Sequence, residues 1–167
     1  KVNQSFALAS GAQLVRLFAW DNTVISDLVG ATTPAEGTGI GGALDGGLLD
    51  KDTEAYIDSG AQVLSNGDVE LRANSDEEIA AIAANLDVAG NVALGGAIEA
   101  YVLLVKTLSF ISSGALVSVP GGVVVDADDR SMIHYVAGIA SDSSGKTAGA
   151  AGSFILLDKT TTAYVDT

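Results

Sequence analysis

The sequence predicts an all-β solenoid in which coils of chain stack in parallel, and three observations support this prediction. The 167-residue chain repeats with a period of about 54 residues, its segments alternate polar and apolar residues, and its composition suits thin layers. TEAYIDSGA at Thr53 returns as TLSFISSGA at Thr107 and as TTAYVDT at Thr161, with no insertion. A unit of this kind buries its apolar face only when a neighbour stacks on it. We therefore expect one elongated array over residues 1–167.

The repeat divides the chain into copies at about 1–52, 53–106 and 107–160, with the start of a further copy at 161–167. SGAQ at Ser10 precedes SGAQ at Ser59 by less than a full period, so the first copy needs a shortened turn. Because the pattern is cut at both ends, we expect a piece of a longer polypeptide. The corresponding positions include Val15, Val69 and Val123; Ala19, Ala73 and Ala127; Ile25, Ile79 and Ile133; and Gly41, Gly95 and Gly149.

Within each copy the residues alternate with a period of two, which is typical of half-buried strands. Ala55 and Ile57 alternate with Glu54 and Tyr56, so we expect the first pair to point inward and the second outward. A second strand shows the same pattern, with Val69, Leu71 and Ala73 inward and Asp68, Glu70 and Arg72 outward. Turns are predicted at DSG from Asp58, SNGD from Ser65 and PGG from Pro120.

One segment also fits a helix. NSDEEIAAIAANL at 74–86 is rich in Ala, and Ser75 and Glu78 have the spacing of a capping box. The equivalent segments of the other copies are β-branched or aromatic, and stacked copies need one conformation. We expect strand in all three copies, with a short helix over Glu77–Asn85 as the alternative.

The length of the repeat predicts more than one coil per copy. With strands of roughly five residues, a repeat of about 54 residues fits two coils of about 27 or three of about 18, and we favour two. At about 4.8 Å per coil the three copies would form a rod roughly 30–45 Å long, with open edges only at the terminal coils. Tyr56, Phe110 and Tyr164 would then lie on the outer face, too far apart to stack.

Composition excludes several classes of partner and site. The net charge is −13, from 21 acidic and 8 basic residues, which disfavours nucleic acid and anionic membrane surfaces. No apolar run approaches the roughly 18 residues needed to span a bilayer. Without Cys, disulfides and thiolate sites are impossible. Hydrophobic residues make up 48% and aromatic residues 5%, so small and aliphatic side chains must fill the layers.

Three acidic clusters raise the possibility of calcium, which prefers several oxygen ligands. The glycine-aspartate nonapeptide of calcium-binding β-rolls is absent, and we favour a solvated acidic face over a metal site. We accordingly assign no metal-binding, cofactor-binding or catalytic residue. The clusters are Asp126, Asp128 and Asp129; Asp45, Asp50 and Asp52; and Asp76 to Glu78.

Other candidate residues also favour structural roles. Asp128 and Asp129 are an adjacent acidic pair, but neighbouring strand residues point to opposite faces, so paired-carboxylate catalysis is not expected. His134 is the single histidine, and a strand-face position suits it better than a metal or triad site. Trp20 could mark an outward contact or pack on a loop. The stretch Ala31–Gly39 is the one insertion-like segment, and we expect a plain loop.

The repeats resemble those of large bacterial filamentous adhesins: the filamentous haemagglutinin-like, two-partner-secretion and leukotoxin-like exoproteins and related autotransporter passengers. The run T-x-A-[YF]-[IV]-x-x-G-A at Thr53, Thr107 and Thr161 carries the likeness, with the strands at 68–73 and 122–127 and the Gly/Ala-rich stretch 89–100. The resemblance implies a right-handed parallel β-helix, exported and held at the bacterial surface.

The resulting expectation is a non-enzymatic structural and adhesive shaft that holds a binding region away from the cell. Its partners would be protein or carbohydrate surfaces of a host or neighbouring cell, with no nucleic acid and no membrane insertion. A self-assembling extracellular filament subunit, joined by homotypic contacts, is the alternative. A β-helical polysaccharide-active enzyme is a third reading.

Overall fold

The computed structural model describes residues 13–167, which form parallel β-sheets and contain no helix. The helical alternative for Glu77–Asn85 is therefore wrong, because this segment lies within β4. The strands are β1 (Val15–Ala35), β2 (Thr38–Ile57), β3 (Gln62–Leu64), β4 (Val69–Ala89), β5 (Val92–Ile111), β6 (Leu116–Ser118), β7 (Val123–Ser143) and β8 (Lys146–Val165). They form sheets in the orders β1-β4-β7, β2-β5-β8 and β3-β6. The all-β, parallel-strand part of the prediction is confirmed.

Successive copies pair in register at an offset of 54 residues, so each repeat makes one circuit of the molecule. Val15 lies opposite Val69, and Val69 lies opposite Val123. We use the word coil for one such circuit, which contributes one strand to each long sheet. The prediction of two or three coils per repeat is wrong. It assumed strands of about five residues, whereas the alternation of each long strand continues for 20 or 21 residues before a turn.

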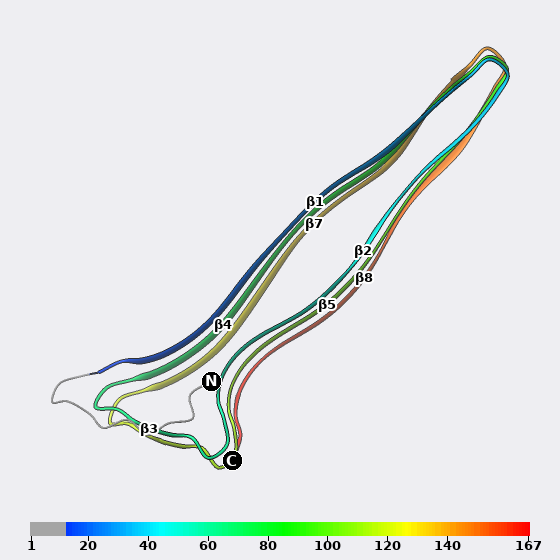
Figure 1. Cartoon of the computed structure of the whole chain (residues 1–167). Helices are drawn as coiled ribbons and strands as arrows, with labels where there is room; N and C mark the ends of the chain where they lie inside the picture. Colours follow the sequence, from blue (N-terminus) through cyan, green and yellow to red (C-terminus); the bar gives the residue numbers. More distant parts are fainter. Residues whose placement is uncertain (1–12) are drawn as a thin grey trace.

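The long dimension of the molecule runs along its strands (Figure 1). Two long layers, β1-β4-β7 and β2-β5-β8, face each other, meet at a narrow tip, and spread apart at the end that holds β3 and β6. A strand of 20 residues spans roughly 65 Å. Three coils at about 4.8 Å make a stack only roughly 15 Å thick. The predicted rod of roughly 30–45 Å is therefore replaced by a flat, wide stack.

Turns occur where the chain carries its strongest turn signals, with one exception. The predicted turns at Asp58, Ser65 and Pro120 all separate strands, and Gly60 adopts a left-handed φ of 73° that favours glycine. The loop predicted over Ala31–Gly39 is reduced to the turn at Glu36 and Gly37, because β1 continues to Ala35 and β2 begins at Thr38. The shortened turn predicted around Ser10 lies outside the described residues.

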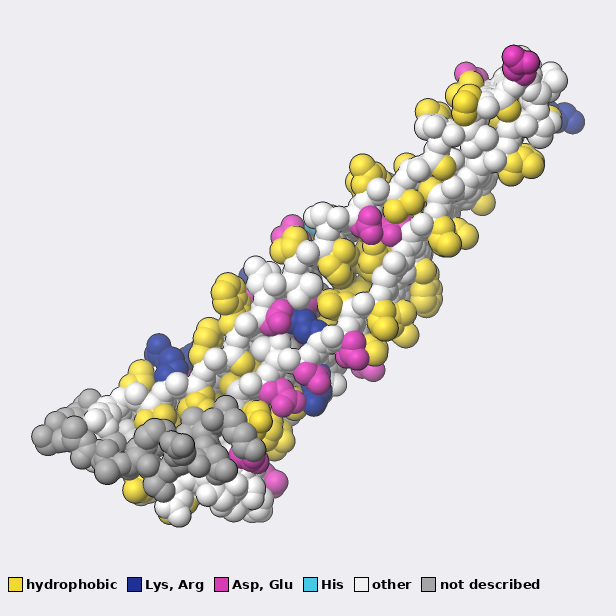
Figure 2. Space-filling view, in the orientation of Figure 1, with side chains coloured by type: hydrophobic (Ala, Val, Ile, Leu, Met, Phe, Trp, Pro, Cys, Tyr) yellow, Lys and Arg dark blue, Asp and Glu magenta, His cyan; other side chains and the backbone are white. Residues whose placement is uncertain are grey.

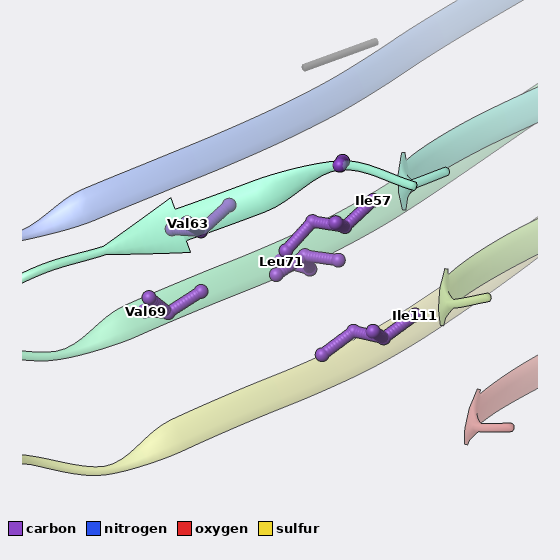
Figure 3. Packing of buried hydrophobic residues seen from close by; sticks show 6 residues of the cluster. Ile57, Val63, Val69, Leu71 and Ile111 are labelled. Carbon is purple, nitrogen blue, oxygen red and sulfur yellow. The ribbon is translucent and has the colours of Figure 1, made fainter. Parts of the chain in front are cut away.

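The interior changes in size along the strands. At the wide end, Ile57, Val63, Leu71 and Ile111 come from four strands and pack together, as Figure 3 shows. The middle is filled by Ile79, Tyr101, Leu103 and neighbouring residues. At the narrow tip the cluster is reduced to Ala43, Ala83 and Ala97. Small residues let the two layers approach each other there.

The inward register follows the alternation of the sequence. Ala55 and Ile57 are buried, whereas Glu54 and Tyr56 are partly exposed, as predicted. Val69, Leu71 and Ala73 are fully buried in the middle coil. The first and third coils are more exposed because each has a neighbour on one side only among the described residues.

Candidate functional sites in the interior and on the outer faces

A network of charged side chains crosses the interior between the two long layers. Lys51 of β2 contacts Asp21 at 2.8 Å and Glu77 at 2.9 Å, both measured from Nζ to a carboxylate oxygen. Lys159 of β8 lies 3.5 Å from the other oxygen of Glu77 and also pairs with Asp129. Glu77 in the middle coil therefore joins lysines of the first and third coils.

The structure explains how these charges are held inside. Burial by itself would raise the pKa of Glu77, but hydrogen bonds from Ser131 (2.6 Å), Ser75 (2.5 Å) and Lys51 (2.9 Å) outweigh it and lower the pKa. Burial raises the pKa of Asp129, and Lys159 only partly opposes this. Glu77 is the best-satisfied acid of the network and remains ionised.

A second interior group is acidic and has no lysine. Tyr101 donates its hydroxyl hydrogen toward Asp45 (3.1 Å) and Asp27 (3.4 Å), and its ring stacks on Tyr135 with 5.2 Å between centroids. Glu99 lies opposite Asp45 in the next coil and is fully buried. In the part of the chain that the structure describes, neither oxygen of Glu99 has a hydrogen-bond partner in standard geometry. Burial raises the pKa of Glu99, and a nearby backbone N–H at residue 83 only partly offsets this.

Sequence reasoning missed both groups because it treated charge as a surface property. The alternation carried the signal, since Lys51 has the inward parity of Ala55, and Glu77 has that of Ile79. The prediction of solvated acidic clusters is wrong for Asp45, Glu77 and Asp129, which face the interior. Their neighbours Asp50, Asp52, Glu78 and Asp128 are exposed. Each cluster is divided between the two sides of its sheet.

Charged side chains on the outer surface pair between coils near the wide end. Arg16 lies 2.6 Å from Glu70, Arg72 lies 3.0 Å from Asp126, and Lys106 lies 3.0 Å from Glu54. A shallow hollow of about 210 Å³ next to Lys106 includes Asp50, Asp52 and Asp158. Figure 2 shows acidic and basic side chains mixed in the wider part of the molecule.

Between the wide end and the turns of the tip the outer faces are mainly hydrophobic, and Figure 2 shows hydrophobic side chains projecting from them. On the β1-β4-β7 face, Leu28, Ile82 and Val136 form a ladder beside a hollow of about 540 Å³ whose floor includes Gly30 and Ala84. On the opposite face, Leu44 and Ile98 border a hollow of about 720 Å³. The outward positions over 40–48, 94–104 and 148–156 carry no charge.

Aromatic residues of the outer surface stack directly. Tyr56 and Phe110 have ring centroids 5.0 Å apart, and Phe110 and Tyr164 have centroids 5.2 Å apart, with rings nearly parallel in both pairs. The prediction that they are too distant to stack is wrong, because one coil per repeat places them on adjacent strands. Trp20 is 62% exposed and lies on the outer face, and a contact made by it stays a prediction. His134 also lies on an exposed strand face.

No protein-family profile, curated protein sequence or solved structure matches the chain. Within residues 13–167 no three His, Asp or Glu side chains are grouped so that they could hold a metal ion. The same residues include no helix that is long and apolar enough to cross a membrane.

Proposed function

We propose that this chain is a structural and adhesive shaft segment of a bacterial cell-surface filament and is built as a right-handed parallel β-helix. The observation that supports this most directly is the in-register parallel pairing of three copies at a fixed offset of 54 residues. Strand connections between parallel strands are right-handed in about 98% of cases, which favours that hand here. Identical pairing at each step lets further repeats be added without a change of geometry.

The shaft resists bending through its hydrogen bonds and its interior. Each step between coils is joined by two long parallel ladders, which pair β1 with β4 and β2 with β5 along their whole lengths. The buried network from Lys51 through Glu77 to Lys159 fixes the relative position of three coils. The chain has no disulfide to do this, since it has no Cys. A shaft of this kind holds a binding region away from a cell surface and needs no ligand site of its own.

The test is a series of arrays with three, six and nine copies of the repeat, measured by small-angle scattering and electron microscopy. The axial length should grow by about 4.8 Å per copy while the cross-section stays constant. Displayed on bacteria with an epitope tag at the far end, longer arrays should make the tag more accessible to antibody above the surface polysaccharide. Arrays that collapse into separate globules, or a tag whose accessibility is independent of copy number, would contradict the proposal.

The apolar outer faces favour a second function, in which the chain assembles side by side into extracellular fibres. Leu28, in the ladder of the β1-β4-β7 face, is 74% exposed. Leu44, at the border of the hollow on the opposite face, is 73% exposed. Contiguous apolar patches larger than a few hundred Å² mark association surfaces in soluble proteins. Every copy has the same axial spacing, so ladders on two shafts stay matched along their length.

Sedimentation velocity over a concentration series tests this second function. Leu44→Glu should abolish concentration-dependent association, because it places a charge at the apolar face. Thr160→Glu adds the same charge to the acidic part of the same sheet and should leave association unchanged. A wild-type chain that is monomeric at all concentrations would remove the assembly function and leave the shaft function in place. An enzymatic function has less support, because Asp128 and Asp129 lie on opposite sides of their sheet.

A further inference from the structure

We propose that the interior of the narrow tip binds one Ca²⁺ ion through side-chain oxygens of Thr33, Asn85 and Asp87. These residues belong to β1 and β4 and face the glycine column of the opposite layer. The site is separate from the acidic clusters that the sequence brings to notice. It also goes beyond the shaft function, which requires no ligand.

Two buried side chains at the narrow tip each leave one acceptor oxygen without a donor. Asp87 is 0% exposed and Asn85 is 3% exposed. The Asn85 side-chain amide donates from Nδ2 to Asp87 Oδ2 at 2.8 Å. The other two oxygens, Asn85 Oδ1 and Asp87 Oδ1, take no part in this bond, and neither has a hydrogen-bond partner among residues 13–167. Two buried acceptors without a donor are costly unless a positive group satisfies them.

Three side-chain oxygens converge beside Gly41. A Cβ added to Gly41 would lie 2.1 Å from Asp87 Oδ1, 2.4 Å from Thr33 Oγ1 and 2.9 Å from Asn85 Oδ1. The three oxygens therefore converge on the side of Gly41 that carries no side chain, and oxygen atoms are the ligands that Ca²⁺ prefers. Any side chain at position 41 would clash with them.

A further oxygen without a partner lies on the same ladder in the third coil, next to the site and not among its three ligands. Thr33, Asp87 and Ser141 occupy one ladder of paired positions across the three coils. Ser141 Oγ has no hydrogen-bond partner within the described residues, and it lies 3.2 Å from the point where a Cβ on Gly95 would be. Gly95 pairs with Gly41, so the same column of glycines gives room to both groups. The ladder carries one carboxylate, in the middle coil, which sets the stoichiometry at one ion.

The donor types select the ion. One carboxylate, one amide oxygen and one hydroxyl oxygen are hard ligands of the kind that Ca²⁺ uses in proteins, with few charges and therefore modest affinity. Within residues 13–167 Asp87 has no ion pair with a Lys or Arg side chain. A buried carboxylate without a cationic partner favours a bound cation. Mg²⁺ is less suitable because it requires near-ideal octahedral geometry.

Isothermal titration calorimetry and thermal unfolding of the whole chain test the proposal. Ca²⁺ should bind with one site per chain, with a dissociation constant of about 10⁻⁴–10⁻³ M, and should raise Tm saturably relative to chelator. Mg²⁺ and Na⁺ at matched ionic strength should not. Asp87→Asn should abolish the Ca²⁺-dependent increase. Asp142→Asn, an exposed carboxylate on the neighbouring strand, should retain it.

A second variant keeps the test decisive if Asp87→Asn folds poorly. Thr33→Val preserves shape and the carboxylate but removes one ligand, and it should weaken Ca²⁺ binding several-fold. No calcium-dependent heat and no change in Tm would overturn the proposal and indicate a water in this space. Equal effects of Ca²⁺ and Mg²⁺, or equal losses in Asp87→Asn and Asp142→Asn, would also overturn it by indicating nonspecific screening. None of these results bears on the shaft function.

Discussion

Lys51 of the first coil and Glu77 of the second form a buried ion pair, with 2.9 Å between Nζ and Oε1 and with side chains 5% and 0% exposed. The lysine also contacts Asp21 of its own coil, so it links two coils through one ammonium group. Position 105, between Lys51 and Lys159 in the same ladder, is Val. Because no third lysine stands between them, Lys51 and Lys159 can both bind Glu77. The network therefore depends on which residue each copy carries at this position.

The first prediction concerns this pair. Glu77→Gln removes the charge that two lysines share and should lower the free energy of unfolding by about 3–5 kcal/mol, as expected when one partner of a buried pair is lost. Glu54→Gln breaks a partly exposed pair with Lys106 and should cost under about 1 kcal/mol. Urea denaturation of both variants measures the difference. Equal losses would show that the interior network is solvated.

The second prediction is the pH dependence contributed by Glu99. Its pKa is raised above the ordinary 4.5 by burial, so above that pH the unfolded chain releases its proton before the folded chain does. This residue therefore makes stability decrease as pH rises from about 4.5 through the folded pKa. Glu99→Gln should flatten that decrease, whereas Glu54→Gln should leave it intact. Urea midpoints between pH 3.5 and 9 test this, and superimposable profiles of wild type and Glu99→Gln would refute it.

Glu77 should act in the opposite direction, which separates the two acids. Its pKa is lowered in the folded state, so its contribution is fully present above the ordinary value of 4.5 and is lost as the pH falls below it. In Glu77→Gln the acid-induced decrease in stability should be smaller than in wild type. An unchanged acid limb, measured by urea midpoints between pH 2 and 6, would contradict the assignment of Glu77 as ionised.

The third prediction tests the number of coils per repeat in solution. Tyr56 and Phe110 stack with ring planes only 4° apart, so a double-mutant cycle of Tyr56→Leu and Phe110→Leu should give a coupling of about 0.5–1.5 kcal/mol. Rings separated by two or three coils would show no coupling. A control cycle of Tyr56→Leu with Leu94→Ala, a distant outward position, should be additive.

The fourth prediction concerns the turns at the narrow tip. A Cβ at Gly90 would lie 2.0 Å from the backbone oxygen of Glu36 in the adjacent coil, and backbone cannot move aside cheaply. Gly90→Ala should therefore cost about 1–3 kcal/mol. Gly37 belongs to the adjacent turn and has open space around its Cα, so Gly37→Ala should change stability by under about 0.5 kcal/mol. Thermal unfolding of the two variants compares them, and equal Tm values would disprove the close approach of the coils.

Several elements of this protein were predictable because they depend on local chemistry. Alternation predicted which side of each strand faces inward, as at Ala55 and Glu54, since successive strand residues point to opposite faces. The period of the repeat predicted which positions pair, and Val15, Val69 and Val123 do so. The turns at Asp58, Ser65 and Pro120 were predictable from local chemistry. Gly tolerates positive φ, Pro fixes φ, and Asp and Asn side chains hydrogen-bond to the nearby backbone.

The tertiary structure alone decided the size of a coil and the chemistry of its interior. No signal in the local sequence prevents a long strand such as β2 from ending after its first few residues. The pairing of entire copies keeps β2 and β5 extended through their glycines. That pairing sets one coil per repeat and brings Tyr56 onto Phe110. It also brings Lys51 to Glu77, and Asn85 and Asp87 to Thr33, because the contacts join opposite layers or successive coils and are long-range in sequence.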